Sequence, residues 1–258
     1  LAAMWQRRQW LEAQEATIEL EPATLAVDLE AARALLAGKL GLLSSQDAAA
    51  LMAIYGIETP REGLAATPED AARLADEIGY PVVLKIASTD IVHKTDVGGI
   101  VTELADAAAV KQAAADMLDR VRAARPDAQI DGVVVQAMIT GGQEVIVGVT
   151  QDPQFGPLAM VGSGGTAVEL MGDVAFALAP ITPHEARAML SRTTLGPVLK
   201  GYRGKPAADR KAIASIIVRL AHLASDLPQV REIEINPVLV RQEGEGAVAV
   251  DVRVMVED

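Results

Sequence analysis

Two segments near the C-terminus most constrain how this chain can fold, because their alternation of apolar and polar residues is typical of β-strands. The first is "REIEINPVLV" (231–240), and the second is "AVAVDVRV" (247–254). If the short stretch "QEGE" (242–245) forms the loop of a hairpin, counting back along both strands puts Asn236 directly opposite Asp251. The sequence therefore predicts a β-hairpin with a pair of polar residues in its middle.

These polar residues carry oxygen atoms that suit a hard cation. Opposed residues of an antiparallel pair have Cβ atoms about 5 Å apart, and amide and carboxylate oxygens bind Mg²⁺, whose shell is completed by phosphates and water. The period of two adds Glu234 to the same face. The alternative is a solvated face on an edge strand, where Pro237 leaves one ladder position without an N–H group. The pattern leaves both open, since a slip of one residue would turn Asp251 to the other face.

Composition bounds the class of protein. The chain has 258 residues, half of them hydrophobic, which is enough for one large domain or two lobes. A net charge of −12 and 3% aromatic residues argue against a nucleic-acid partner, which needs basic clusters and stacking platforms. The absence of cysteine excludes disulfides and thiolate metal sites. No apolar run reaches the length of about 20 residues that spans a membrane, so we expect no membrane partner and a cytoplasmic location. Because the chain begins at Leu1, we also expect a piece of a longer polypeptide.

The order of the expected elements predicts an α/β (α+β) fold with two lobes. We take residues 1–42 as a linker with helical segments, and a compact domain begins near residue 43. A small lobe spans about 60–133, and a larger lobe spans about 43–59 together with 134–258. Two lobes of this kind leave a cleft between them, where ligands usually bind.

The clearest helix signal lies in the small lobe, in "TPEDAARLADEIG" (67–79). Thr67 is spaced as an N-cap, Pro68 takes the first helical position, and Gly79 ends the helix. The strand formers of 81–87 follow at once. We therefore expect a helix that leads directly into a buried strand.

The stretch "YPVVLKIASTDIVHKTDVGGI" (80–100) raises the question of function. Lys85 is either a lysine that reaches solvent at a strand tip or a charge aimed at a phosphate. Gly98 and Gly99 allow the backbone to approach an anion closely and offer N–H groups to it, beside a second lysine, Lys94. His93 is a surface residue, a core residue, or a phosphoryl acceptor or acid–base group. The residue types alone leave these alternatives open.

Two further segments carry weaker signals. "VGSGGTAVELMGD" (161–173) is a Gly-rich turn after a strand, and its Gly164 and Gly165 have N–H groups that could hold a phosphate, although such turns are common. "KGYRGK" (200–205) is a basic run before a helix, and a solvated loop is as good an interpretation as a phosphate contact.

Three long motifs together resemble a known family. They are "GYPVVLKIASTDIVHKTDVGGI", "QEVIVGVTQDPQFGPLAMVGSGGTAVELMGDVAFALAPIT" and "EIEINPV…AVDVRV". Residues 43–258 resemble the ATP-grasp domain of the NDP-forming acyl-CoA synthetases, typified by ADP-forming acetyl-CoA synthetase. They are more distantly similar to the succinyl-CoA synthetase β subunit. The resemblance implies an ATP-grasp fold, with two α/β lobes around a nucleotide cleft.

The resemblance also implies roles for individual residues. It implies ATP/ADP and Mg²⁺ as cofactors, with Asn236 and Asp251 as the metal ligands. It makes His93 a carrier of the phosphoryl group and Glu234 a residue that steadies a phosphohistidine arriving from a partner. The residues it assigns to ATP are Lys85, Lys94, Gly98, Gly99, Gln136, Ala137, Met138, Ile139, Glu144, Gly164 and Gly165.

The implied activity is that of an acid–thiol ligase of the acetate–CoA ligase (ADP-forming) type. Acid, CoA and ATP give acyl-CoA, ADP and phosphate, and the chain acts together with CoA-binding and ligase domains that carry a phosphohistidine. These domains lie in the same polypeptide or in a partner subunit. A first alternative is a nucleotide-sensing regulatory domain fused to a GNAT-type protein lysine acetyltransferase. A second is a carboxylate–amine ligase, which would form no phosphohistidine and which the His-Lys loop argues against.

Overall fold

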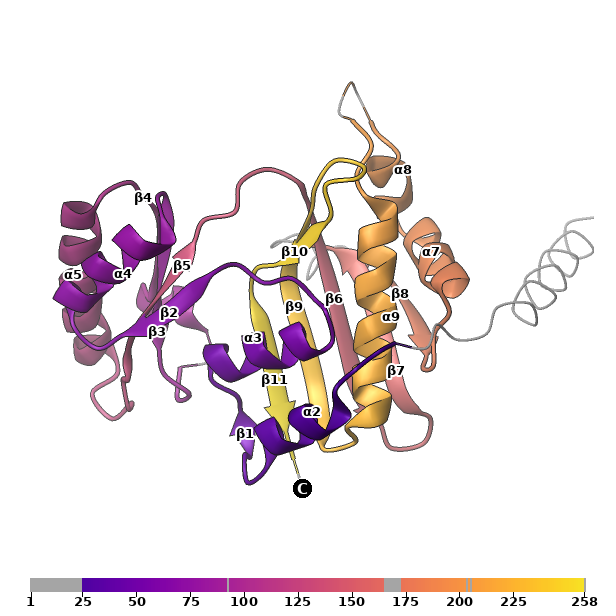
Figure 1. Ribbon diagram of the computed structural model, residues 1–258, viewed down its shortest axis with the longest axis horizontal. Coiled ribbons are helices and arrows are strands. Elements are labelled where there is room, and N and C mark those ends of the chain that lie inside the picture. Colours follow the sequence, from indigo (N-terminus) through magenta and orange to yellow (C-terminus); the bar gives the residue numbers. More distant parts are fainter. Residues whose placement is uncertain (1–24, 92, 165–172, 203, 205, 258) are drawn as a thin grey trace, which may run out of the picture.

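Two antiparallel β-sheets, each with its own hydrophobic core, organise the chain (Figure 1). The structure is a computed structural model that describes residues 25–91, 93–164, 173–202, 204 and 206–257. A four-stranded sheet forms a small lobe and a seven-stranded sheet forms a large lobe. No helix in these described ranges combines the length and apolar character needed to cross a membrane.

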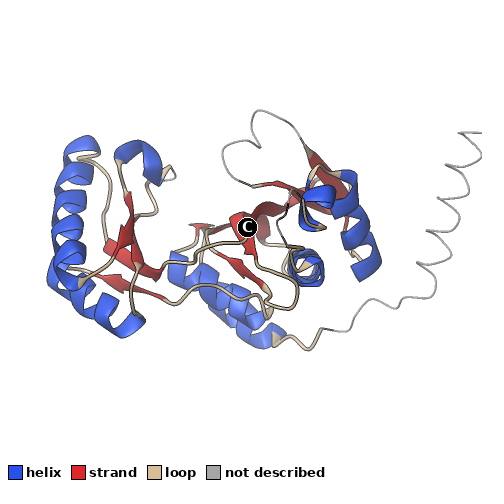
Figure 2. Ribbon diagram, turned by 90° about the horizontal axis from the view of Figure 1, so that it is seen from above, coloured by secondary structure: helices blue, strands red, loops and turns tan. Residues whose placement is uncertain are grey.

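The small lobe is a sheet with two helices on its outer face (Figure 2). Its strands, in spatial order, are β2 (Glu62–Ala65), β5 (Gly132–Ala137), β3 (Val82–Ala87) and β4 (Ile100–Leu104). The helices are α4 (Pro68–Ile78) and α5 (Ala107–Ala124). Leu84 and Ile86 of β3 point into the core beneath these helices, with Val110 and Met117 of α5. Because β5 continues to Ala137, residues 134–137, expected in the larger lobe, belong to the small sheet.

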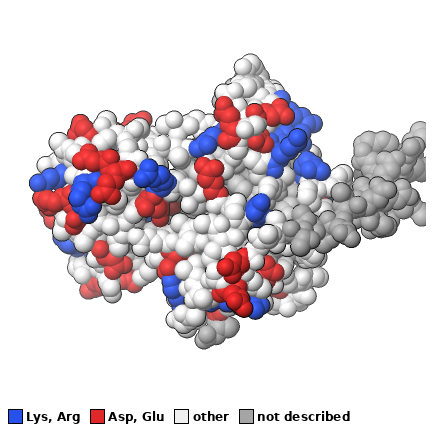
Figure 3. Space-filling view, viewed as in Figure 1, with Lys and Arg blue, Asp and Glu red and all other residues white. Residues whose placement is uncertain are grey.

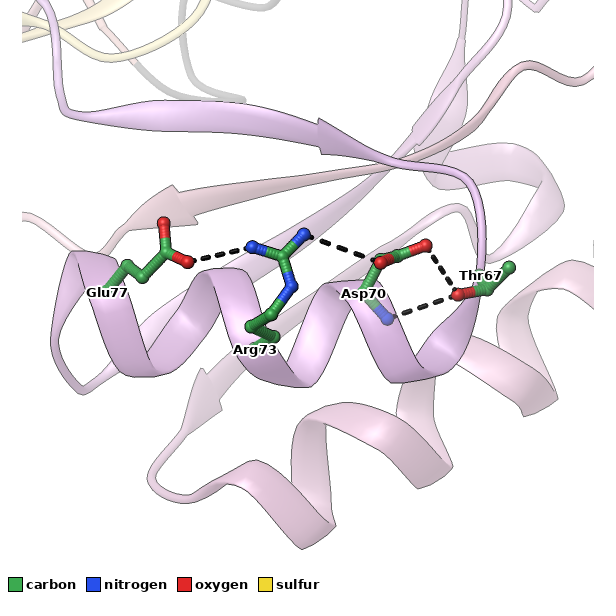
Figure 4. Close-up of polar contacts among 4 residues, drawn as sticks. All are labelled: Thr67, Asp70, Arg73 and Glu77. Carbon is green, nitrogen blue, oxygen red and sulfur yellow. Dashed lines mark hydrogen bonds and ion pairs between the residues drawn. The ribbon is translucent and has the colours of Figure 1, made fainter.

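Helix α4 begins and ends where the sequence predicts. Thr67 Oγ1 accepts a hydrogen bond from the Asp70 N–H at 3.1 Å, and Gly79 follows the last turn with φ of 96°. On the solvent side, Arg73 lies 3.4 Å from Asp70 and 2.8 Å from Glu77 (Figure 4). In the view of Figure 3, acidic and basic side chains are interspersed on the visible surface of the small lobe. The apolar side of each helix is left for the sheet.

The large lobe is a sheet with helices on one face. Its strand order is β1-β11-β9-β6-β7-β8, and β10 also pairs with β9. The strands are β1 (Gly41–Leu42), β6 (Gln143–Asp152), β7 (Gly156–Ser163), β8 (Val174–Leu178), β9 (Val230–Val240), β10 (Ala247–Ala249) and β11 (Val252–Val256). The helices are α2 (Leu29–Leu36), α3 (Ser45–Ile54), α7 (Pro183–Arg192), α8 (Leu195–Leu199) and α9 (Arg210–Asp226). Helix α9 packs across one face of β6, β7 and β9 (Figure 1), and residues on the opposite face of these strands line a cavity.

The register of the C-terminal hairpin confirms the count made on the sequence. The Arg241 N–H donates to Gly246 O at 3.0 Å, which closes the four-residue loop, and Asn236 N–H donates to Asp251 O at 3.0 Å. Asn236 therefore lies opposite Asp251. Strand β9 pairs with β10 and β11 on one side and with β6 on the other. It is a central strand, so the edge-strand alternative is wrong.

Residues 29–42 differ from the expected linker. Helix α2 forms as an Ala/Leu-rich helix, but its Ala32 and Leu36 are buried in the large core, and β1 pairs with β11. The reason is that the apolar side of α2 packs beside α3, which covers β11. Residues 1–24 of the expected linker lie outside the described part of the chain.

Asp209 fastens the hairpin turn to the start of α9. Its Oδ1 accepts from the Ala212 N–H at 3.0 Å, and its Oδ2 accepts from the N–H groups of Gly244 and Gly246 at 3.1 Å. Burial raises the pKa of this carboxyl, but the backbone donors outweigh that effect and leave the pKa below its usual value. The carboxylate form is therefore the one that stabilises the fold.

Replacing Asp209 with alanine is expected to lower the free energy of unfolding by about 1–2 kcal/mol near neutral pH. Because the folded-state pKa is depressed, this contribution is complete above the unfolded-state value of about 3.9 and is lost as the pH falls through the folded-state pKa. Urea titrations of both proteins at pH 7 and pH 3 test this. The exposed Asp119, replaced in the same way, is the control. A difference that stays equal at both pH values would contradict the prediction.

Candidate functional site

A cavity of about 790 Å³ lies between the two sheets. Along β3, Leu84 and Ile86 enter the small core, so the alternate residues Val83 and Lys85 face the cavity. Along β6, the valines enter the large core, so Ile146 faces the cavity. The period of two in each strand thus decides which side chains can meet a ligand.

One end of this cavity is apolar. Met138 and Ile139, in the connection from β5 to β6, line it together with Ile146, Met160 and Phe176 of the large sheet. Gly148 of β6 lies beside Met160 of β7 in the same wall and adds no side chain to it. An apolar slot of this kind suits a flat, weakly polar group such as a purine ring.

The other end is polar, and Lys85 is its centre. The Lys85 side chain is 9% exposed, and its Nζ lies 3.2 Å from Asp251 Oδ1 and donates to Val250 O, also at 3.2 Å. A lysine is rarely buried unless it is paired. The interpretation of Lys85 as a strand-tip lysine in solvent is therefore wrong, and its ammonium group lies inside the cleft.

Polar residues of β9, two of them acidic, continue this end of the cavity. Glu232, Glu234 and Asn236 alternate with core residues and line the cavity. Glu234 lies opposite Arg253 of β11, and the two side chains approach to 3.6 Å. Glu234 is thus held by a cation while it faces the cleft.

The donors present fit a hard cation. Among the described residues, no group of three or more His, Cys, Asp or Glu side chains forms a metal site by itself. Asn236 and Asp251 lie opposite each other, and Asp251 already attracts the ammonium group of Lys85. One carboxylate and one amide oxygen match Mg²⁺, which keeps most of its shell for phosphate and water. These two residues would hold it.

The loop after β3 is compact. Residues Lys94–Val97 form a 3₁₀ turn, and Gly98 follows it with φ of 63°. The Gly98 N–H donates to Thr95 O at 3.0 Å, and the Gly99 N–H donates to Lys94 O at 2.7 Å. Both amides are used inside the turn, which corrects the expectation that they are offered to an anion. These glycines instead give the turn its conformation and space, because a Cβ on Gly99 would lie 2.6 Å from Ile86.

Lys94 and His93 differ in their surroundings. Lys94 lines a smaller cavity of about 100 Å³ on the other side of the Lys85–Asp251 pair. Burial lowers the pKa of Lys94, the Asp251 carboxylate counteracts this, and Lys85 adds to the lowering. His93 is exposed at the start of the 3₁₀ turn and lines neither cavity.

The structure brings together part of the expected residue set. The expected residues that line the main cavity are Lys85, Gln136, Ala137, Met138, Ile139, Glu234, Asn236 and Asp251. Those outside its wall are His93, Lys94, Gly98, Gly99, Glu144 and Gly164. Glu144 is on the cleft side of β6, with its carbonyl accepting from the Gly164 N–H at 3.2 Å. Gly165 lies outside the described residues.

Several cavity residues were missed from the sequence. Glu232 could have been predicted from the same alternation along the strand that placed Glu234 on this face. Arg253 could have been predicted from the hairpin register that pairs Asn236 with Asp251. Met160 and Phe176 carry no comparable signal, because apolar residues on β7 and β8 suit a core equally well.

Comparison with known proteins identifies the family. The family model described as an ATP-grasp domain matches residues 34–256. The chain belongs to this family. The match starts in α2 and ends in β11, so it takes in both lobes of this ATP-grasp chain and the cavity between them.

Its relatives are ligases that form acyl-CoA. The chain is 39% identical over 213 residues to the β subunit of ADP-forming acetate–CoA ligase I of Pyrococcus furiosus, covering 83% of this chain and 91% of that one. It is 44% identical over 190 residues to ADP-forming acetate–CoA ligase I of Archaeoglobus fulgidus. This alignment covers 74% of this chain but only 28% of that longer protein. The structure of the dinucleotide-forming acetyl-coenzyme A synthetase 1 of Ca. Korarchaeum cryptofilum, in complex with coenzyme A and Ca-AMPCP, superposes with a TM-score of 0.83 at 35% identity. That match covers 88% of this chain and 100% of the other.

Proposed function

We propose that the chain is the nucleotide-binding and phosphoryl-transferring part of an ADP-forming acyl-CoA synthetase. The observation that supports this most is the burial of Lys85 beside Asp251 at the polar end of the cleft. A buried ammonium group that faces a cavity, and whose carboxylate partner can be exchanged for another anion, marks a candidate site for a charged ligand. The identity to acetate–CoA ligases supports the same reaction class.

In this proposal the adenine lies in the apolar slot near Met138 and Met160, and the phosphates extend toward Lys85. Phosphoryl transfer needs positioning and neutralisation of charge more than covalent help from the protein. Lys85 exchanges its bond to Asp251 for one to a phosphate oxygen. Mg²⁺, when bound at Asn236 and Asp251, supplies further neutralisation of phosphate charge.

The acceptor of the phosphoryl group is an imidazole nitrogen. As the P–N bond forms, the bond between the γ-phosphorus and its bridging oxygen breaks, and ADP leaves with that electron pair. We assign the role of acceptor on this chain to His93, which lies in the loop after β3 outside the walls of both cavities, and whose exposure leaves it accessible to a second protein segment. Glu234, held by Arg253, steadies the phosphohistidine of the CoA-binding and ligase domains. The whole reaction converts acid, CoA and ATP into acyl-CoA, ADP and phosphate.

These partner domains lie outside the matched region. The chain spans most of the Pyrococcus furiosus β subunit but about a quarter of the Archaeoglobus fulgidus ligase. We therefore propose that it works with a subunit or domain that supplies the remainder. The relatives described above are all named as ligases or synthetases, so we favour this role over nucleotide sensing within an acetyltransferase.

Incubation of the chain with γ-³²P-labelled ATP and Mg²⁺ tests the transfer. We expect an acid-labile label on the unaltered chain and on His184→Ala, a control for the loss of a histidine on α7, and none on His93→Ala. Label that persists in His93→Ala would remove His93 from the role of acceptor. A chain that binds ATP but takes up no label would leave nucleotide binding intact and contradict transfer to this chain.

A further inference from the structure

Gln136 is bound within the protein, although it lies beside the cleft. It lies opposite Glu62 in the pairing of β2 with β5, is 3% exposed, and contributes to the walls of both the large and the small cavity. Its Nε2 donates to Glu62 Oε2 at 2.6 Å and to Val250 O at 3.3 Å. An amide NH₂ has two hydrogens, so both donors are used inside the protein. Only the Oε1 acceptor of this side chain has no protein partner.

The carbonyl oxygen of Val250, in the large lobe, accepts hydrogen bonds from two side chains of the small lobe. It accepts from Gln136 at 3.3 Å and from Lys85 Nζ at 3.2 Å, and a carbonyl oxygen has two lone pairs for this purpose. Val250 directly precedes Asp251 in the segment between β10 and β11. On the opposite side, the Val250 N–H donates to Pro237 O at 3.0 Å. Val250, the residue before Asp251, is therefore hydrogen-bonded through both its N–H and its carbonyl.

The two donors to Val250 respond differently to an anionic ligand. Lys85 is charged, and phosphate oxygens compete directly for its ammonium group. Gln136 is neutral and is hydrogen-bonded to the Glu62 carboxylate, whose negative charge repels phosphate. When Lys85 moves to a phosphate, Gln136 is thus the donor that stays on Val250.

We propose that Gln136, oriented by Glu62, is a positioning residue for Asp251: it keeps the Val250 carbonyl in place while Lys85 exchanges Asp251 for phosphate. This inference rests on the proposed function, because it takes Lys85 as a phosphate ligand and Asp251 as a metal ligand. It replaces the expectation that Gln136 is a direct contact of ATP. A positioning residue affects metal affinity, whereas an adenosine contact affects nucleotide affinity.

Titration with Mn²⁺ alone, followed by the electron paramagnetic resonance of free Mn²⁺, separates these roles. The 258-residue chain with Lys85→Met is the reference, because Lys85 then no longer competes for Asp251. In this reference, adding Gln136→Met is expected to weaken Mn²⁺ binding about ten-fold. In the unaltered chain, Gln136→Met alone is expected to leave the affinity for metal-free ATP within two-fold. Gln112→Met on the exposed side of α5 is the matched control for loss of a glutamine.

Two substitutions of Glu62 in the Lys85→Met reference give an independent readout. Glu62→Gln retains an acceptor for the Gln136 amide and is expected to keep most of the Mn²⁺ affinity. Glu62→Leu removes the acceptor and is expected to lose affinity as Gln136→Met does. If Glu62 and Gln136 acted only in folding, the folded fraction of each Glu62 variant would bind Mn²⁺ with the same affinity. The two Glu62 variants therefore test the positioning role even if Gln136→Met does not fold.

Three results would overturn the proposal. Equal Mn²⁺ affinity with and without Gln136→Met contradicts it, and weaker ATP binding together with unchanged Mn²⁺ binding makes Gln136 an adenosine contact. Failure of Lys85→Met to bind Mn²⁺ at all removes Asp251 as a metal ligand, and the inference with it. A wild-type chain that binds no ATP contradicts the proposed function instead, and the Mn²⁺ comparison still stands.

Discussion

Lys85→Met is expected to lower phosphoryl transfer from ATP by about 10²–10³-fold, the usual effect of removing one preorganised group that stabilises transition-state charge. Methionine keeps the length and apolar stem of lysine but has no charge. The substitution leaves Asp251 without the ammonium group 3.2 Å away. We therefore expect Mn²⁺ to bind more tightly than to the unaltered chain when no nucleotide is present. Labelled ATP measures the first effect, and Mn²⁺ titration measures the second.

Two control lysines make this result specific. Lys111 on α5 is exposed and pairs with Glu69 at 2.8 Å, so Lys111→Met should change neither transfer nor metal binding. The charge of Lys94 interacts with that of Asp251, but no hydrogen bond joins the two side chains among the described contacts. Lys94→Met therefore reports the effect of losing a nearby positive charge alone. If Lys94→Met strengthened Mn²⁺ binding as much as Lys85→Met, direct competition between Lys85 and the metal would be contradicted.

The hairpin shows what the sequence is able to predict. Its loop length and the period of two determine the register, and from that register follow the Asn236–Asp251 pair and the face that carries Glu234. The limits of α4 follow in the same way from Thr67 and Gly79. Such features depend on residues close in the chain or on strands joined by a short loop, so local rules are sufficient.

Interactions between the lobes could not be predicted in this way. Gln136 and Lys85 donate to Val250, which is 114 and 165 residues away in the chain. No spacing rule connects these positions, and the buried state of Lys85 depends on how the two sheets face each other. The family resemblance selected both residues as ATP ligands but did not reveal that each is bonded to the hairpin.

The glycines after β3 illustrate a second limit. "VGG" is consistent with amides offered to an anion and with a tight turn, and the two differ only in where the N–H groups point. In the structure the Gly98 and Gly99 amides donate to Thr95 and Lys94 within the same turn. The glycines are required by the turn and by the close approach of Ile86, so their presence alone says little about a ligand.

Asp251→Asn is expected to have effects of opposite sign on nucleotide binding and on transfer. Asparagine keeps the shape of the side chain but removes the charge that attracts a metal, so we expect transfer from ATP to fall by about 10²–10³-fold, as for Lys85. The concentration of Mg²⁺ needed for half-maximal transfer should rise. Metal-free ATP should bind more tightly, because a carboxylate no longer holds Lys85 or repels the phosphates.

Slower transfer combined with tighter binding of metal-free ATP distinguishes a metal ligand from a structural residue. If Asp251 only held the lobes together through Lys85, its loss would loosen the cleft, and metal-free ATP binding would weaken along with transfer. Calorimetric titration of ATP in the presence of a chelator, set beside transfer assays over a range of Mg²⁺ concentrations, tells the two apart. Asp127→Asn, in the exposed loop before β5, controls for the loss of one negative charge and should leave both measurements unchanged. Tighter metal-free binding combined with slower transfer is the result that assigns Asp251 to the metal, because a carboxylate next to phosphates favours binding only when a cation lies between them.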